Sequence, residues 1–260
     1  MQHNGKVCYL GDDDLLGAAK YLAGILTHFG IPYDRVDSPN TPPETFLEEP
    51  YSLYIFSDYP AARMSAAMFE VLKRNVAQGS GLVMLGGWES FYGRLGEYHQ
   101  TPMTELLPVT MADADDRRNY PQPVLVVPAP GKENHPVLAG LPWNTPPGVG
   151  GFNAFQPKPD AEVLLEAVRF RVQFTSGEFG FQKQETVPLL VAGTYGDGKT
   201  AALATDVAPH WVGGWVDWGT PRITQDVPGS DFVDIGCDYA KFFRNLVQFL
   251  KKGGGLKQIL

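Results

Sequence analysis

The stretch LVMLGGWESFYG, residues 82–93, decides the fold that we predict for this 260-residue chain. Its first residues form an apolar run that is typical of a buried strand, and the two glycines that follow predict a tight turn. Many α/β proteins present a reactive side chain at a turn of this kind. Here the turn offers Trp88, Glu89 and Ser90, and it contains no cysteine.

Short apolar runs alternate with amphipathic segments through the first part of the chain. The order is KVCYLG, residues 14–29, IPYDRV, SLYIFS, residues 64–78 and GLVMLGG. This rhythm predicts strands joined by crossover helices, and therefore a parallel sheet. Residues 14–29 predict the first helix, with Gly30 at its C-terminal cap. Residues 38–50 are rich in proline and acidic groups, which predicts a surface loop with one short helical turn.

The alternation is lost between about residue 94 and residue 185, where prolines are frequent. This middle excursion favours antiparallel strands, such as PVLVVPA and AEVLLEAVRFRVQF. The last third regains its order, with two apolar runs about a Gly-Asp-Gly turn and a final amphipathic helix in YAKFFRNLVQFLKK. We interpret residues 1–260 as a single α/β domain, near the upper end of the usual domain size.

Composition limits the classes of partner. The formal net charge is −8 and the isoelectric point is near 5.1, so no basic face is available for nucleic acid. No apolar run reaches the roughly 20 residues that span a bilayer. The two cysteines, Cys8 and Cys237, lack metal-type spacing, and the N-terminus does not look like a secretion signal. We expect a cytoplasmic protein with free thiols and no membrane partner.

Residues 193–200, GTYGDGKT, match the phosphate-loop pattern letter by letter. A working phosphate loop opens a helix, whereas the residues that follow here read as a strand and reach Pro209 within about ten positions. We therefore predict a hairpin turn at Gly196-Asp197-Gly198, with Lys199 in solvent at the strand edge.

Three stretches together resemble the glutamine amidotransferase-like family, which is related to the ThuA-type proteins. They are LGGWESFYGRLGEYHQTPMTELLPVTM, HPVLAGLPW and YGDGKTAALATDVAPHW. The resemblance implies a flavodoxin-like three-layer α/β/α sandwich with a mostly parallel central sheet and an elaborated middle excursion. It also implies a functional pocket at the carboxyl ends of the parallel strands.

Class I members of this superfamily carry a cysteine at the strand-to-helix elbow, completed by a histidine and a glutamate. In this sequence the elbow holds residues 86–90, and neither Cys8 in the first strand nor Cys237 near the last helix can stand there. Thioester chemistry needs an activated thiolate beside an oxyanion site. We therefore expect no glutaminase activity.

The resemblance places His210 near the position of the family's triad histidine, facing Glu89 or Ser90 at the elbow. A histidine paired with a carboxylate serves as a general base or binds a polar ligand or a metal. The structural alternative is a hydrogen-bonded His210 packed among Trp211, Trp215 and Trp218, with Glu89 capping a helix after the turn.

Strand ends would add an acidic rim to the same edge. It consists of Asp12, Asp13 and Asp14 after the first strand, Asp58 after the third, and Asp206 after the late strand. Such carboxylates together with His210 could hold a divalent ion, although no compact motif indicates a metal or another cofactor. Alternatively, Asp14 caps the first helix and Asp58 starts a turn.

Two further segments have both functional and structural interpretations. Residues 112–121, ADADDRRNYP, could grip an anion through Arg117 or Arg118, or form a solvated loop with local ion pairs. Trp88 and the tryptophans of HWVGGWVDW could stack on a sugar ring, form a hydrophobic plug, or line a subunit interface.

Our first hypothesis is a protein that binds a small polar ligand at the elbow pocket. The candidate ligand-binding residues are Trp88, Ser90, Asp12, Asp58, Asp206 and Trp211, with His210 and Glu89 as candidate catalytic residues. The rival is a hydrolase or isomerase acting on a carbohydrate-like or amide substrate through His210 and Glu89. A third hypothesis is a structural or regulatory subunit, including a homo-oligomer.

Overall fold

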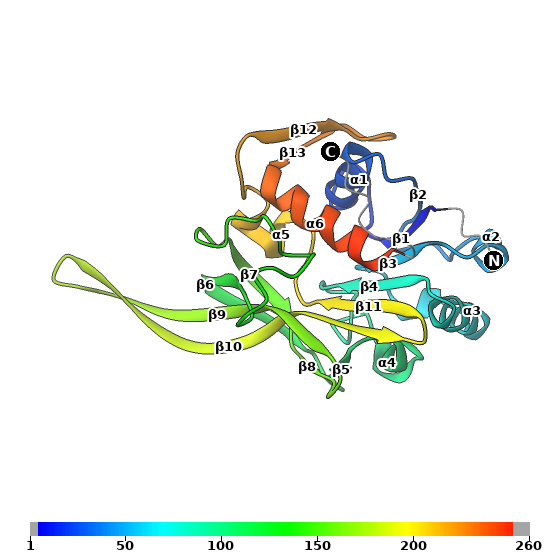
Figure 1. Ribbon diagram of the computed structural model, residues 1–260, viewed down its shortest axis with the longest axis horizontal. Helices are drawn as coiled ribbons and strands as arrows, with labels where there is room; N and C mark the ends of the chain where they lie inside the picture. The colour runs from blue at the N-terminus through cyan, green and yellow to red at the C-terminus, as the bar shows by residue number, and fades with distance from the viewer. Residues whose placement is uncertain (1–4, 252–260) are drawn as a thin grey trace.

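The alternating apolar segments form the parallel half of a nine-stranded sheet in the computed structural model, which describes residues 5–251 (Figure 1). The strands of this half are β1 (Val7–Gly11), β2 (Tyr33–Val36), β3 (Leu53–Ser57), β4 (Gly81–Leu85) and β11 (Gly198–Leu203), in the order β2-β1-β3-β4-β11. Every residue of β1, β3 and β4 is buried. Continuous burial explains why these strands read as unbroken apolar runs.

The middle excursion forms the other half of the same sheet. Its strands are β10 (Glu178–Tyr195), β9 (Glu162–Thr175), β6 (Arg117–Pro128) and β7 (Gly148–Asn153), and all of their pairings in this sheet are antiparallel. The predicted mostly parallel sheet is therefore wrong. The reason is the connection between β10 and β11, since strands joined by a tight hairpin must run in opposite directions.

Helices cover both faces of the parallel half. Asn75 of α3 (Ala66–Ala77) donates a hydrogen bond to the Tyr54 hydroxyl at 2.7 Å. Leu53, the residue before Tyr54 in β3, pairs with Gly81 of β4. A Cβ on Gly81 would lie 2.4 Å from the backbone oxygen of Leu250, the last residue of α6 (Cys237–Leu250). Successive residues of a strand face opposite sides, so α3 and α6 lie on opposite faces of the sheet. Helix α1 (Ala19–His28) packs against α6 (Figure 1).

The remaining elements are short. They are α2 (Thr45–Glu48), η1 (Ala61–Arg63), η2 (Tyr98–Gln100), α4 (Met103–Leu106), β5 (Val109–Met111), β8 (Phe155–Pro157), α5 (Pro209–Val212), η3 (Gly213–Trp215), β12 (Arg222–Asp226) and β13 (Phe232–Gly236). Strands β5 and β8 form one small antiparallel sheet, and β12 and β13 form another. Among the described helices, none has the length and apolar character required to cross a membrane.

The predicted elements are present, with one shortened helix. Helix α1 begins at Ala19, although its apolar periodicity predicted a start near residue 14. The Asp14 side chain accepts a hydrogen bond from the Leu16 amide at 2.9 Å and forms a turn ahead of the helix. Gly30 follows the helix with φ +60°, as predicted for its C-terminal cap.

Strands β9 and β10 continue past their neighbours as a two-stranded arm. Pairing of β9 with β6 stops at Val168, and pairing of β10 with β11 begins at Leu190. The arm extends away from the body of the molecule at the left of Figure 1. Three phenylalanines on it are largely exposed, namely Phe174, Phe179 and Phe181.

The phosphate-loop match is a hairpin, as predicted. Tyr195 of β10 pairs with Gly198 of β11 across a two-residue turn. The prediction that Lys199 lies in solvent is wrong, because its side chain contacts Phe249. Its Nζ donates to the backbone oxygen of Phe249 at 2.9 Å and lies 4.2 Å from the centre of that residue's ring. Lys199 thus supports the last turn of α6.

Lys199→Ala is expected to lower the free energy of unfolding by about 1 kcal/mol, because it removes a charge-assisted hydrogen bond and a cation–π contact. Urea denaturation measures the change, with Lys183→Ala on the exposed arm as the neutral control. ATP should stabilise neither protein. Protection by ATP that depends on Lys199 would instead restore the phosphate-loop interpretation.

Candidate functional site

Three residues from separate segments meet at the carboxyl ends of the parallel strands. Asp58 follows β3, Asp206 lies shortly after β11, and His210 lies on α5. One potential ligand atom from each lies within 4.8 Å of the others. We call this group the carboxylate–imidazole cluster. Of the predicted acidic rim, Asp58 and Asp206 meet with His210 at this edge, where ligands of open α/β sheets bind.

Asp206 is fully buried, and backbone amides fix one of its two oxygens. Its Oδ1 accepts hydrogen bonds from the amides of Val207 at 2.5 Å and Ala208 at 2.9 Å. Its Oδ2 lies 2.9 Å from Nε2 of His210, whose side chain is 56% exposed. The neighbouring carboxylate raises the pKa of His210 above its usual value. His210 is therefore paired with Asp206, whereas the sequence had suggested Glu89.

Asp58 is inserted into the glycine turn that follows β4. Its Oδ1 accepts a hydrogen bond from the Glu89 amide at 2.7 Å, and its own amide donates to the Ser90 hydroxyl at 3.1 Å. A Cβ on Gly87 would lie 1.9 Å from Oδ1 of Asp58. Asp58 also has φ +45°, a strained value for a residue with a side chain. Gly87 is therefore the residue that makes room for this carboxylate.

The elbow is a series of turns, and no helix follows it directly. Residues 86–97 contain neither helix nor strand, so Glu89 does not cap a helix. The Gly87 amide donates to Asn153 Oδ1 at 2.8 Å, and the amides of Tyr92 and Gly93 donate to the Asp116 carboxylate. Several amides that could have stabilised an oxyanion are thus already bonded to internal side chains.

Both cysteines lie where the sequence placed them. Cys8 is buried within β1, where desolvation strongly raises the pKa of its thiol, and Cys237 is the first residue of α6. A buried thiol with a raised pKa is a poor nucleophile.

Asp12 is a second buried carboxylate beside the cluster. It accepts a hydrogen bond from the Tyr9 hydroxyl, and its backbone oxygen accepts one from Arg35 at 2.6 Å. Burial, followed by the charge of Asp206, raises the pKa of Asp12 to about 7. Burial likewise raises the pKa of Asp58 well above its usual range, reinforced by Asp206 and Asp12. Negative charge at this edge is incompletely balanced by the protein.

The other predicted ligand-binding residues divide into exposed and buried groups. Trp88 is 42% exposed, and the Arg117 guanidinium lies 4.5 Å from its ring centre. Trp211 is buried and donates from Nε1 to Asn119 at 2.9 Å. Ser90 is also buried, with its hydroxyl bonded to Asp58. Ser90 and Trp211 are therefore buried supports of the site and are not accessible to a ligand.

Remaining candidates lie outside the cluster or are bonded elsewhere. Glu89 is half-buried, which raises the pKa of its carboxyl, with a further contribution from Asp13. Trp215 and Trp218 are buried, which matches the plug interpretation of the tryptophan loop. Arg117 forms the predicted local ion pair with Asp115 at 2.6 Å, but the predicted solvated loop is wrong, because Arg117 begins β6 and pairs with Asn153 of β7.

Two buried residues that hold the elbow in place were missed from the sequence, namely Asn153 and Asp116. Asn153 bridges the elbow and the Asp116 carboxylate, to which its Nδ2 donates at 2.8 Å. Asp116 had been read as part of a charged surface run. Both residues act through contacts distant in sequence, and no local motif marks them.

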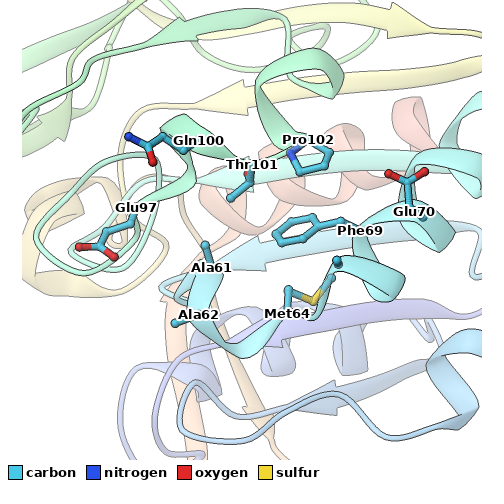
Figure 2. Close-up of a pocket in the computed structure, with 10 residues that line it drawn as sticks. Ala61, Ala62, Met64, Phe69, Glu70, Glu97, Gln100, Thr101 and Pro102 are labelled. Carbon is cyan, nitrogen blue, oxygen red and sulfur yellow. The ribbon is translucent and has the colours of Figure 1, made fainter.

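Two hollows lie near this part of the molecule. The first, of about 580 Å³, adjoins the cluster and is lined by Leu16, Gly17, Ala18, Lys20, Tyr21, Pro209 and His210. We call it the His210 depression. The second, of about 410 Å³, lies between η1, α3 and the segment from Glu97 to Pro102. Figure 2 shows Phe69 and Met64 in this second hollow, with Glu70 and Glu97 at separate places on its rim. It contains none of the candidate site residues.

Comparisons with known proteins agree with this architecture. A family model described as "Putative glutamine amidotransferase" matches residues 44–223. The cytoplasmic protein STM3548 of Salmonella typhimurium has a similar fold, with a TM-score of 0.73 and 24% identity over 95% of this chain and 99% of its own. The cytoplasmic protein STM1381 of the same species is also similar, with a TM-score of 0.69 and 24% identity over 95% of this chain and 100% of its own.

A ThuA-like protein from Bacteroides uniformis is a more distant structural neighbour. Its TM-score is 0.54 and its identity is 14%, over 98% of this chain and 96% of its own. No curated protein sequence matches the chain. At these identities the solved structures establish the fold alone.

The stability of this edge should depend on pH through Asp12. Because its folded pKa of about 7 exceeds the unfolded value of about 4, the folded state binds more protons between these values. Stabilisation by the protonated carboxyl is therefore complete below about pH 4 and is lost as the pH rises through 7. The melting temperature of Asp12→Asn relative to the wild type should therefore be several degrees higher at pH 8 than at pH 5.

Charged and titratable groups that interact with Asp12 are Tyr9, Arg35, Asp58, Asp206, His210 and Tyr239. Thermal denaturation in the presence of a chelator measures the effect, with the exposed Asp160→Asn as the matched control. If the difference in melting temperature between Asp12→Asn and the wild type is the same at pH 8 and at pH 5, the raised pKa of Asp12 is contradicted.

Gly87→Ala should destabilise the fold by about 1–3 kcal/mol, because the added methyl group would overlap the Asp58 carboxylate. Gly214→Ala is the control, since a Cβ there has nothing within 4 Å. Chemical denaturation of the two variants provides the comparison. Equal stability of Gly87→Ala and the wild type would mean that Asp58 does not occupy the turn.

Proposed function

Because this chain belongs to the glutamine amidotransferase-like family, we propose that it uses the family's strand-edge position to bind a small polar ligand without hydrolysing glutamine. The single observation that carries the proposal is the meeting of Asp58, Asp206 and His210 beside an open depression. The cytoplasmic location expected from the sequence is part of the proposal, and two structural neighbours are named as cytoplasmic proteins.

Loss of glutaminase chemistry is supported by two independent features. The elbow has no thiol, and Cys8 is sealed inside β1. The elbow amides of Gly87 and Glu89 are bonded to Asn153 and Asp58. A thioester mechanism requires both a thiolate and donors left free for the developing oxyanion. At the elbow the thiol is missing, and the amides of Gly87 and Glu89 are already used.

A polar ligand is supported by the chemistry around the His210 depression. His210 forms one wall and has Asp206 behind it, and Lys20 lines the depression while paired with Asp231 at 3.1 Å. Leu16 is 63% exposed and gives the same hollow an apolar surface. Such a hollow suits a molecule that has hydrogen-bonding groups at one end and carbon surface along its side.

A second function, hydrolysis or isomerisation, is favoured by the Asp206–His210 pair. A buried carboxylate that orients an exposed imidazole is the arrangement of a general base. In this enzymatic hypothesis the carboxylate partner of His210 is Asp206, where the sequence had suggested Glu89. Homo-oligomerisation stays a prediction.

A thermal-shift screen tests ligand binding, with glutamine, sugars, sugar phosphates and nucleotides as probes. A ligand at 100 times its dissociation constant stabilises the fold by about 2.7 kcal/mol, which corresponds to a shift of roughly 5–10 °C. The shift should disappear in His210→Ala and persist in His28→Ala, which removes an exposed histidine distant from the cluster. The screen is run with chelator and again with added divalent ions.

Glutamate release from glutamine should stay at background in the same samples. Measurable glutaminase activity would refute the proposal, as would probes that shift wild type and His210→Ala alike. Turnover of a probe that is lost in both His210→Ala and Asp206→Asn would favour the enzymatic function.

A further inference from the structure

We propose that the carboxylate–imidazole cluster holds one divalent first-row cation, of the Zn²⁺ or Mn²⁺ class, through Asp58, Asp206 and His210. The inference rests on the proposed function of this site and deepens it, because the ion would be the group that meets the polar ligand. It stands on four observations: separation, unused oxygens, charge and access.

The separation of the three side chains is close to that of shared ligands. Ligand atoms about 2.0–2.2 Å from one ion lie roughly 2.8–4.4 Å from one another, depending on geometry. Here the three candidate atoms lie within 4.8 Å. Closing the remaining gap requires a small movement. His210 can supply that movement, because its side chain is 56% exposed.

Asp58 and Asp206 are each held in place through one carboxylate oxygen, and the other oxygen is available to a metal ion. Asp206 uses Oδ1 for two backbone amides, and its buried Oδ2 receives no hydrogen bond within residues 5–251 while facing the imidazole. Asp58 uses Oδ1 for the Glu89 amide, which leaves its second oxygen for a ligand. Backbone donors that fix one oxygen of a carboxylate are a common way to orient a metal ligand.

Charge at the cluster favours a cation. Asp12, Asp58 and Asp206 are clustered with little access to solvent, and burying several carboxylates together is costly unless a positive charge joins them. Arg35 offers only partial relief, because its guanidinium donates to Asp37 and to the backbone oxygens of Gly11 and Asp12. One imidazole and two carboxylates match Zn²⁺ or Mn²⁺, whereas Ca²⁺ takes six to eight oxygens.

Access to the ion would be from one side. Of the three residues, His210 alone lines the His210 depression and is well exposed, so the path from solvent to the cluster passes its imidazole. A site with three protein ligands and an open position is characteristic of ions that bind a water molecule or substrate. The ligand class implied is a small molecule that offers a hydroxyl or carboxylate oxygen to the metal.

Isothermal titration calorimetry with ZnCl₂ and MnCl₂ tests the inference on chelator-treated, full-length protein that carries no histidine tag. Wild type and His28→Ala should each bind one ion per chain at the cluster. Affinity should fall at least about 100-fold in His210→Ala and in Asp58→Asn, as expected when a direct ligand is lost. Circular dichroism confirms that each variant is folded, and His210→Ala is the safer variant because the residue is exposed.

Co²⁺ absorption adds a readout that a merely structural role would not change. The visible bands of the wild-type Co²⁺ complex should be lost in His210→Ala and unchanged in His28→Ala. Failure of all three ions to bind the wild type would overturn the inference, as would equal affinity or an identical Co²⁺ spectrum in His210→Ala.

The two proposals fail in different ways. If the metal titrations fail and a polar probe still gives a His210-dependent shift in chelator, the metal inference is wrong and the proposed function stands. If the ion binds as expected and no probe shifts the protein with or without it, the proposed polar-ligand function is wrong.

Discussion

The hydrogen bond from the Glu89 amide to the Asp58 carboxylate is the constraint on which this edge of the molecule depends. It brings a carboxylate from the end of β3 onto the turn that follows β4, at a place where Gly87 leaves no Cβ in the way. Asp58 adopts a strained backbone conformation to reach it. Strain of this kind persists where the surrounding structure enforces it, and it clusters at functional sites. Asp206 and His210 then complete the group from the segment that follows β11.

This arrangement is the basis for our proposal that the chain keeps the family's fold without its glutamine hydrolysis. An elbow that serves a thiolate must present free amides to an oxyanion. Here the amides of Gly87, Glu89 and Gly93 donate to Asn153, Asp58 and Asp116. The carboxylate–imidazole cluster lies beside the elbow, at the ends of the neighbouring strands β3 and β11. Function follows from the site and not from the fold alone. What the site offers is a buried carboxylate pair with an exposed imidazole, which suits a cation or a polar ligand.

Sequence reasoning located the strand ends and therefore the residues at the edge. Asp12, Asp58 and Asp206 follow apolar runs, and parallel strands bring their carboxyl ends to the same edge. The resemblance placed His210 opposite Glu89 or Ser90 at the elbow, whereas the structure pairs it with Asp206, four residues earlier in its own segment. The proportion of parallel strands was also overestimated, since a sequence pattern does not show that β9 and β10 join the same sheet. Asn153 acts on Gly87 across 66 positions, a distance at which no motif operates.

The most direct test of this account is a pH titration of the Glu89 amide by two-dimensional ¹H–¹⁵N NMR. An amide that donates to a carboxylate reports the titration of that carboxylate, and burial raises the pKa of Asp58 well above its usual range. The account predicts that the Glu89 resonance moves with a midpoint well above pH 4, and that this transition is absent in Asp58→Asn. A Glu89 amide that does not titrate, or that titrates identically in Asp58→Asn, would contradict the placement of Asp58 in the turn.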